Sequence, residues 1–383
     1  MKVVIAIDSY KGSVTSLQAG EAAKAGVLAA CPGAKVEVLP LADGGEGTVE
    51  ALTVALGGHL VEVDVTGPME ERETAVYGFM EETGTAVMEM AQAAGLPMVP
   101  VEERNPMKAT SFGVGEQIAD AVKKGCRHIW MGIGGSATND GGVGMLQALG
   151  WRFLDKEGNE VAKGGQGLAD ICTIDDSQVL PGVKETVFEI ACDVENPLCG
   201  PKGASAIYGP QKGATEEMVA QLDAGLSHFA DVAEAFLEKS GRNLPGSGAA
   251  GGLGFALTAF LGGTLKSGIE MVLDAMDMDA HLQGADVVIT GEGRLDGQTA
   301  MGKAPVGVAK RAKEAGAVVI AVAGCTEDAA VACNQAGIDA FFAVTDRAMT
   351  LQEAMDQKTT EKNIKKTTEQ AMRLYLAAKK ENY

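Results

Sequence analysis

Short apolar runs alternate with helical segments at the start of the chain, a pattern typical of parallel β-α units. Residues 3–7 (Val-Val-Ile-Ala-Ile) predict a strand, and a helix is expected to begin at Thr15 or Ser16. A second strand is predicted at 36–39 and a second helix over about 48–56. The same alternation returns late in the chain, over residues 286–290, 305–315, 317–322 and 341–344.

The middle of the chain differs, because two stretches alternate apolar and polar residues with period two. Residues 60–65 and 74–79 flank a turn at Gly67-Pro68 and predict an antiparallel hairpin. Further strands are expected at 85–90, 129–133 and 188–191, and helices at 112–123 and 215–239.

These patterns predict an α/β protein of two domains. Both chain ends together supply five short apolar strands, enough for one doubly wound parallel sheet. We expect this Rossmann-like domain to comprise residues 1–62 and 284–383, with residues 63–283 forming an inserted mixed α/β domain. Two helices should close the chain, with capping-box patterns at Thr350-x-x-Glu353 and Thr367-x-x-Gln370.

Charge and cysteine content exclude several function classes. The chain has 52 acidic and 32 basic side chains, a net charge of 32 − 52 = −20, which excludes a nucleic-acid binder. Seven cysteines without a C-x-x-C pair indicate neither a disulfide framework nor a zinc site. The longest uncharged run, residues 243–265, is expected to be a buried glycine-rich loop and helix rather than a membrane span. The first residues show no secretory signal pattern, so we expect a cytoplasmic protein.

Acidic, glycine-rich sequences follow three of the predicted parallel strands. They are residues 8–12 (Asp-Ser-Tyr-Lys-Gly), 42–48 (Ala-Asp-Gly-Gly-Glu-Gly-Thr) and 291–297 (Gly-Glu-Gly-Arg-Leu-Asp-Gly). A single Asp at a strand end is usually a turn or cap residue. Ligands of open parallel sheets, however, bind at the carboxyl ends of the strands, so we expect this rim to form the active site.

Two loops of the inserted domain carry further candidates. Residues 132–144 follow a strand and precede a helix, so their backbone N–H groups can form a phosphate-binding nest. The alternative is a tight turn capped by Ser136 or Asp140. After the strand at 188–191, Asp193 and Asn196 are suited to hold Mg²⁺ or a substrate hydroxyl.

Two familiar patterns carry less weight. Residues 246–251 fit G-x-G-x-x-G, but no strand precedes them, so a Rossmann cofactor site is not expected there. Residues 297–304 resemble a P-loop, but Ala304 stands where the Mg²⁺-binding Ser or Thr belongs. Candidates for phosphate or carboxylate contact are the isolated cations Lys11, Lys212, Arg294 and Lys303. Together the loops predict Mg²⁺-dependent phosphoryl transfer between the two domains.

These loops resemble the bacterial-type glycerate kinases, which act in glyoxylate and sugar-acid catabolism. The resemblance covers almost the whole chain and is carried by residues 8–13, 42–48, 134–142, 193 with 196–198, 211–214, 248–252 and 289–293. Tyr10 departs from the Phe that is common in the family. The resemblance implies a two-domain α/β protein that phosphorylates D-glycerate with ATP and Mg²⁺ in its interdomain cleft. The 2-hydroxyl is favoured, giving 2-phosphoglycerate, with the 3-hydroxyl as the alternative.

The chemistry of phosphoryl transfer suggests a role for each candidate. We expect Asp43 to act as the base, Lys11 and Asp193 as further catalytic groups, and Asp193 and Glu292 to hold Mg²⁺. The nucleotide phosphates are expected on Gly134, Gly135, Ser136, Thr138, Asn139 and Asp140, with Lys303 nearby. Glycerate is expected at Asp8, Ser9, Glu46 and Asp296, with its carboxylate on Lys11 or Arg294. Exchanging the roles of Asp43, Asp193 and Asp296 fits the sequence almost as well.

Two other functions use the same features. A Mg²⁺-dependent phosphatase also needs carboxylates and anion nests, but Asp8 is followed by Ser9 and Tyr10 rather than by a second nearby Asp. A two-domain sugar-acid sensor needs no excess of carboxylates. Glycerate-dependent formation of ADP separates the kinase from both. The expected partner is therefore D-glycerate, with no nucleic acid and no membrane, and the sequence leaves the oligomeric state open, a homodimer included.

Overall fold

The computed structural model describes residues 1–41 and 48–380 and divides into two compact units. Unit 1 comprises Met1–Ala55 and Ile269–Tyr383, and unit 2 comprises Leu56–Gly268. The divisions fall 7 residues before the first expected boundary, 62/63, and 15 residues before the second, 283/284. The first does so because β3 (His59–Thr66) pairs along its whole length with β4 (Arg72–Met80) of unit 2.

Unit 1 is built on a five-stranded sheet with the order β13-β12-β11-β1-β2. Every neighbouring pair is parallel, which confirms the expected doubly wound sheet. The chain passes from β1 to β2 on one side and later to β11 on the other, so the switch point lies between β1 and β11. The strands are β1 (Lys2–Ile7), β2 (Lys35–Val38), β11 (Val287–Leu295), β12 (Val318–Thr326) and β13 (Ala340–Ala343).

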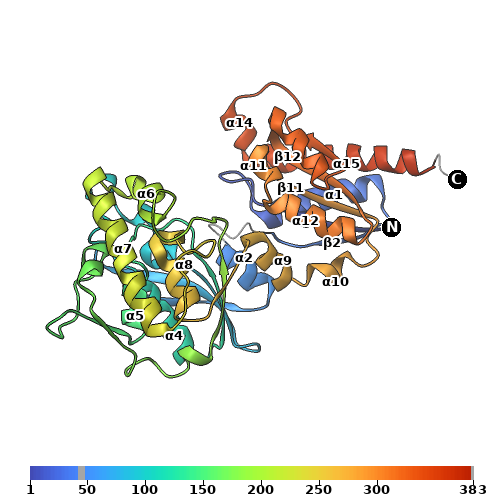
Figure 1. Ribbon diagram of the computed structural model, residues 1–383. Helices are drawn as coiled ribbons and strands as arrows, with labels where there is room; N and C mark the ends of the chain where they lie inside the picture. Colours follow the sequence, from blue (N-terminus) through green and yellow to red (C-terminus); the bar gives the residue numbers. More distant parts are fainter. Residues whose placement is uncertain (42–47, 381–383) are drawn as a thin grey trace. The chain divides into compact units, whose positions relative to one another are not determined.

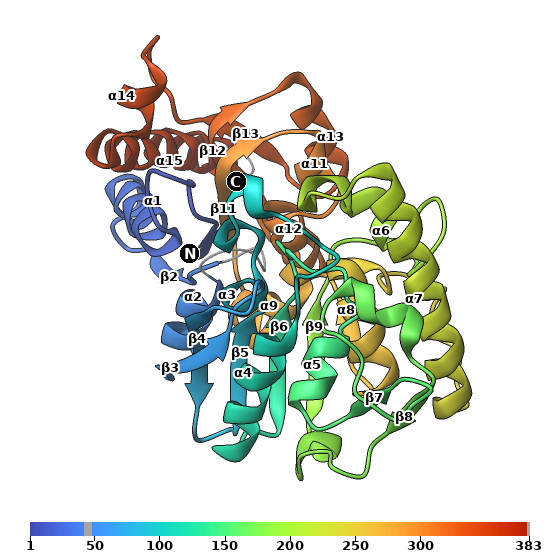
Figure 2. The ribbon, with the colours of Figure 1, turned by 90° about the vertical axis from the view of Figure 1, so that its left-hand side faces the viewer.

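Helices cover both faces of this sheet. α1 (Ser16–Ala30) and α15 (Gln357–Lys380) pack together on one face, and α12 (Ala304–Glu314) packs against β11 and β12 on the other (Figure 2). α1 begins as expected, with Thr15 and Gln18 forming a capping box. The remaining helices of this part are α2 (Thr48–Ala55), α9 (Gly268–Ala275), α10 (Met278–Leu282), α11 (Gly297–Ala300), α13 (Ala332–Gln335) and α14 (Leu351–Met355).

The two final helices are only partly as the sequence indicated. The capping box of Thr350 with Glu353 is confirmed at the start of α14. The second expected start, at Thr367, is wrong, because α15 begins at Gln357 and continues through that position. Ile364 and Met372 lie on either side of Thr367 in the sequence and both are buried in the core of unit 1, so the packed face of the helix extends past it.

β11 is longer than expected, which changes where its polar residues lie. The loop predicted at 291–297 is wrong for its first five residues, because they continue the strand beside β12. The pairing requires close backbone approach: a Cβ at Gly291 would overlap the Val322 carbonyl oxygen, and one at Gly324 would overlap that of Gly293. Residues 292 and 294 therefore stand on a paired strand rather than in a loop.

Unit 2 contains a six-stranded mixed sheet with the order β10-β9-β6-β5-β4-β3. β3 and β4 form the antiparallel hairpin that the period-two pattern predicted, and β4 also pairs antiparallel with β5. The strands from β5 to β10 in this order are parallel. They are β5 (Thr85–Glu89), β6 (His128–Gly132), β9 (Val187–Ala191) and β10 (Thr264–Lys266), while β7 (Arg152–Leu154) and β8 (Thr173–Asp175) form a small separate sheet.

An aromatic cluster ties the helices of unit 2 together. Phe229 of α7 (Glu216–Leu237) stacks on Phe260 with ring centroids 6.2 Å apart. It also meets Phe255 of α8 (Ala249–Ala259) edge-on at 5.7 Å. Figure 1 shows these two helices, and the other helices of this unit are α3 (Ala91–Ala94), α4 (Phe112–Lys123), α5 (Val143–Ala148) and α6 (Ala204–Tyr208). The bounds of α4 are those predicted from its apolar spacing.

The long uncharged run of residues 243–265 forms a loop and a helix, as expected. Ala250, Gly251 and Gly252 adopt left-handed conformations that kink α8 near its start. At Gly251 the backbone passes so close to the Thr138 carbonyl oxygen that a Cβ would overlap it. Within the described ranges, no helix is both long and apolar enough to cross a membrane.

Replacing Gly26 tests the packing of α1 against α15. A Cβ at Gly26 would overlap the carbonyl oxygen of Lys365, whereas Gly33 has open space around it. We expect Gly26→Ala to lower the free energy of unfolding by about 1–3 kcal/mol, and Gly33→Ala to change it by no more than about 0.5 kcal/mol. Urea unfolding followed by circular dichroism measures both, and equal effects would contradict the close packing.

Candidate active site

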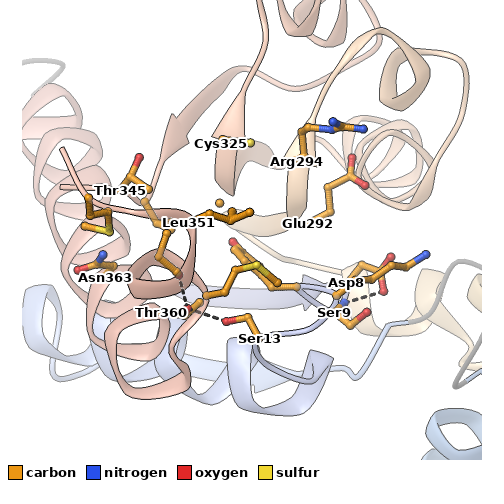
Figure 3. A pocket seen from close by; sticks show the side chains of 18 of the residues that line it. Asp8, Ser9, Ser13, Glu292, Arg294, Cys325, Thr345, Leu351, Thr360 and Asn363 are labelled. Carbon is orange, nitrogen blue, oxygen red and sulfur yellow. Dashed lines mark hydrogen bonds between the residues drawn. The ribbon is translucent and has the colours of Figure 1, made fainter. Parts of the chain in front are cut away.

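A cavity of about 780 Å³ lies at the carboxyl end of the unit 1 sheet. Its wall takes residues from the loop after β1, the end of β11, the end of β12 and the segment after β13 (Figure 3). This is the place where open parallel sheets bind ligands. The candidates from the sequence that line this one cavity are Asp8, Ser9, Lys11, Glu292, Arg294, Asp296 and Lys303.

The loop after β1 is fastened to β12 by Tyr10. This side chain is 4% exposed, and its hydroxyl donates a hydrogen bond to the Val322 carbonyl oxygen at 2.8 Å. Burial, and then the negative charge of Glu292, raise the pKa of the phenol, so it remains a neutral donor. Asp8, at the start of the loop, accepts a hydrogen bond on Oδ1 from the Ser9 N–H at 2.6 Å. The loop therefore presents Asp8 and Lys11 on a fixed support.

Glu292 and Asp296 are connected through Thr299. The Thr299 hydroxyl donates to Glu292 Oε1 at 2.5 Å, and the Thr299 N–H donates to Asp296 Oδ1 at 3.1 Å. Burial opposes ionisation of Asp296, but the N–H groups of Thr299 and Gln298 outweigh it and hold its pKa below the usual value. Asp296 thus serves as the anionic N-cap of α11.

Four cations line the cavity beside three acids. The cations are Lys11, Arg294, Lys303 and Arg347, and the acids are Asp8, Glu292 and Asp296. The Arg294 guanidinium lies 3.4 Å from Asp296 Oδ2 and 3.5 Å from Glu327 Oε1, yet the side chain is 61% exposed. In a chain of net charge −20 this local excess of positive charge favours an anionic ligand.

The opposite end of the cavity was missed by the sequence analysis. It is formed by the segment after β13, by α14 and by the first turns of α15 (Figure 3). Ligands of parallel sheets bind at the carboxyl ends of the strands, and this expectation, applied to β12 and β13, would have indicated Cys325 and Thr345. No local pattern indicates Leu351 or Asn363, because they reach the cavity only through the packing of the C-terminal helices on the sheet.

In unit 2 the glycine-rich loop between β6 and α5 is organised by a buried carboxylate. Asp140 Oδ2 accepts hydrogen bonds from the Ser111 N–H and hydroxyl, both at 2.8 Å, and from the Gly144 N–H at 3.3 Å. Its Oδ1 accepts one from the Gly142 N–H at 3.1 Å. Burial raises the pKa of this carboxyl, and the four donors oppose the rise. Asp140 is therefore an internal anchor of the loop, as in the alternative of a capped turn.

Lys212 is buried beneath the same loop. Its ammonium donates to the Thr138 carbonyl oxygen at 2.6 Å and to Ser136 Oγ at 3.4 Å, and the residue is 3% exposed. Burial lowers the pKa of Lys212 to about 7, although the charge of Asp140 opposes the shift. The side chains of Ser136 and Thr138 are thus engaged inside the loop.

The other polar candidates of this loop are also buried or are glycines. Asn139 Nδ2 donates to Ser205 Oγ at 3.0 Å, while Asn139 Oδ1 is buried without a hydrogen-bond partner among the residues that the structure describes. Gly134 and Gly135 are exposed. The loop therefore offers backbone rather than side chains on its outer face.

The remaining candidates are dispersed. Asp193 follows β9 and is exposed, and its Oδ1 accepts a hydrogen bond from the Gly268 N–H at 3.0 Å. Asp193 belongs to unit 2, whereas Glu292 belongs to unit 1. Asp43 and Glu46 lie outside the described residues. In residues 1–41 and 48–380, no three His, Cys, Asp or Glu side chains meet as a metal site.

Known proteins of one family match the chain closely. The model of the glycerate kinase family matches residues 3–376. A glycerate kinase from Bacillus subtilis (strain 168) is 48% identical over 356 residues, which is 93% of each chain. A glycerate 2-kinase from Escherichia coli (strain K12) is 48% identical over 354 residues, 92% of this chain and 93% of its own. A crystal structure described as glycerate kinase 2 from Salmonella typhimurium LT2 has a TM-score of 0.91 at 46% identity, with 99% of both chains covered.

The burial of Lys212 makes stability depend on pH above neutrality. Its pKa is about 7 in the folded protein against an ordinary value of 10.5, so between these values the unfolded chain binds the extra proton. Stability should therefore rise with pH across this range, by up to about 1.4 kcal/mol per pH unit. Lys212→Met lacks the titrating amine and should lose this slope. Urea unfolding of both proteins from about pH 7 to about pH 9 measures it, and parallel pH profiles would contradict the expectation.

Proposed function

The chain belongs to the glycerate kinase family, and from this premise we propose that it transfers a phosphoryl group from ATP to the 2-hydroxyl of D-glycerate with the help of Mg²⁺. Phosphorylation of glycerate is the activity for which its relatives are named. The choice of the 2-hydroxyl is supported by the relative named glycerate 2-kinase. Neither the phosphatase nor the sensor has support among these relatives. The proposal includes a cytoplasmic location, where ATP is available.

The observation that carries this proposal is the mixed charge of the unit 1 cavity. Phosphoryl transfer has little covalent chemistry for the protein to perform, so catalysis rests on positioning and on neutralising the phosphate charge. Lys11, Arg294 and Lys303 supply cations to the lining of this cavity. The planar guanidinium of Arg294 suits the carboxylate of glycerate, and Lys303 suits a phosphate as a point charge.

The carboxylates of the cavity fit a magnesium ion in their chemistry. Mg²⁺ in phosphoryl-transfer sites is commonly held by one or two carboxylates together with substrate phosphates and water. Glu292, whose Oε1 accepts a hydrogen bond from the Thr299 hydroxyl, and the exposed Asp193 are the carboxylates proposed as ligands. When bound, the ion offsets negative charge on the phosphates.

The base is proposed to be Asp43, a role that rests on the sequence alone. Asp296, which fitted the sequence almost as well, is a poorer choice, because its oxygens cap α11 and lie against Arg294. Its lowered pKa also makes it a weaker proton acceptor. We therefore assign Asp296 to holding Arg294 in position, with Asp8, Ser9 and Glu46 proposed beside the substrate.

A coupled assay of ADP release tests the function. With ATP, Mg²⁺ and D-glycerate, we expect ADP to form only when glycerate is present. Phosphorus NMR of the product should show 2-phosphoglycerate. A 3-phosphoglycerate signal would support the kinase activity but show that the 3-hydroxyl, and not the 2-hydroxyl, accepts the phosphoryl group. No glycerate-dependent ADP would contradict the proposal.

Conservative substitution of the carboxylates tests the assigned roles. Asp43→Asn, Asp193→Asn and Glu292→Gln should each lower turnover by about 100-fold or more, because base catalysis or metal binding is lost. Glu21→Gln is the matched control, because Glu21 is exposed on α1 and pairs with Lys24. Steady-state kinetics at saturating substrates measures the effect. If all three variants keep a turnover within about threefold of the unaltered protein, the roles assigned to these carboxylates are wrong.

A further inference from the structure

The unit 1 cavity is larger than a three-carbon acid requires. Its volume of about 780 Å³ falls within the range of pockets that enclose ligands of nucleotide size. The acidic lining residues all lie at one end, on the β1 loop, β11 and the start of α11. Figure 3 shows Asp8 and Glu292 on one side of the cavity, and Thr345, Leu351 and Asn363 on the other. The cavity therefore has an acidic end, and a second end whose lining includes the cation Arg347 beside apolar side chains.

The second end presents apolar side chains that no part of unit 1 covers fully. Leu351 of α14 is 75% exposed and Met355 is 36% exposed, and both line the cavity. Val344, Met349 and Ala354 extend this wall. Exposed apolar side chains gathered on a concave surface commonly mark a ligand site. A flat aromatic group is a suitable occupant, since it buries both of its faces against such side chains.

Asn363 adds a polar group at this end. It is 4% exposed and lines the cavity, and its carboxamide makes no hydrogen bond with any other residue in the described part of the chain. Thr360, one turn earlier on α15, is by contrast satisfied by the Ala354 carbonyl oxygen at 2.9 Å and by Ser13 Oγ at 2.7 Å. The side chain is thus held in a buried position while its amide faces the cavity without a protein partner, so Asn363 can bind a ligand that offers both a donor and an acceptor.

Resting on the kinase activity proposed above, we propose that this end of the cavity binds the adenine base of ATP, and that Asn363 selects adenine. The 6-amino group of adenine is a donor, and the ring nitrogen beside it is an acceptor. A carboxamide matches this pair with its oxygen and its amino group, as it does when it recognises adenine in nucleic acids. The apolar wall of Leu351 and Met355 covers the faces of the ring.

The acidic end, which also carries Lys11 of the β1 loop, then receives the phosphates of the same nucleotide. Lys11 and Lys303 line the same cavity as Asn363, so one extended ligand meets both ends, and Arg294 is left for the carboxylate of glycerate. Glycerate is a poor occupant of the second end, because it has no apolar face to set against Leu351. The inference differs from the placement of the nucleotide on residues 134–142 of unit 2. There Ser136 and Thr138 are hydrogen-bonded to each other and to the buried Lys212, and Asp140 accepts hydrogen bonds from Ser111.

Two substitutions of Asn363 test the base-selecting role. Asn363→Leu keeps the size but removes both hydrogen bonds, so kcat/KM for ATP should fall about tenfold or more, with the KM for glycerate unchanged. Asn363→Asp keeps the acceptor but replaces the donor, and a carboxylate suits the N–H groups of guanine rather than adenine. The ratio of kcat/KM for ATP to that for GTP should therefore fall about tenfold or more in Asn363→Asp.

The apolar wall is tested with a pair of exposed leucines. Leu351→Ala should weaken ADP binding, measured by calorimetry on the full chain, about fivefold. Leu374→Ala on α15 is the matched control, since Leu374 is 64% exposed and does not line the cavity. Gln370→Leu, an exposed amide on the same helix, is the control for Asn363→Leu. Neither control should change ADP binding or the ATP to GTP ratio, and circular dichroism confirms that all variants fold.

The outcomes separate this inference from the proposed function. If glycerate-dependent ADP formation is present but Asn363→Leu, Asn363→Asp and Leu351→Ala behave as their controls do, the kinase stands and the adenine site is refuted. If the unaltered chain binds ADP and the variants lose it, yet no glycerate is phosphorylated, the adenine site stands and the proposed function is refuted. A fall in glycerate affinity alone, with ADP binding intact, would also overturn the adenine site.

Discussion

The close approach of β11 and β12 beyond the body of the sheet is the constraint on which the unit 1 cavity depends. Their pairing continues through Arg294 opposite Cys325 only because positions 291 and 324 carry no side chain. This extension carries Glu292 and Arg294 beyond the end of β1, whose last residue, Ile7, pairs with Gly291. Without it both residues would belong to a loop, and their positions relative to Asp8 would not be set by backbone hydrogen bonds.

The two units treat charge in opposite ways. In unit 2, Asp140 and Lys212 are buried, and both form hydrogen bonds with the backbone around them, which holds that loop in one conformation. In unit 1, cations and acids line an open cavity, and Arg294 is mostly exposed. Buried charges of the first kind hold a backbone in shape, whereas exposed charges of the second kind remain available to a ligand. The contrast explains why similar glycine-rich sequences serve different purposes here.

Periodicity, and the expectation that ligands bind at the carboxyl ends of parallel strands, predicted most of the fold and one end of the cavity. Helix α4 and the β3-β4 hairpin follow directly from local apolar spacing. Asp8 and Glu292 were found because they follow the strands predicted at 3–7 and 286–290, although Glu292 itself lies within β11. The length of β11 was not predictable in this way. Gly291 allows β11 to approach β12 closely, but in a single sequence a glycine-rich stretch is typical of a loop. Asn363 was missed for a related reason: nothing near it in the chain distinguishes it from other polar residues of a long helix. Its surroundings come from α14 and β13, which only packing brings to it.

The interior place of β1 in the unit 1 sheet has a consequence for how the chain is made. β1 lies between β2 and β11, and its first N–H is bonded to Asp286, 284 positions later. At a synthesis rate of roughly 5–20 residues per second, the nascent strand waits on the order of 15–60 s for that neighbour. During this interval one edge of the apolar segment 3–7 has no strand beside it, while the contiguous unit 2 emerges and can complete its own core. An unpaired strand edge is prone to aggregation, so during synthesis this edge needs protection by chaperones, because the chain itself has not yet made β11.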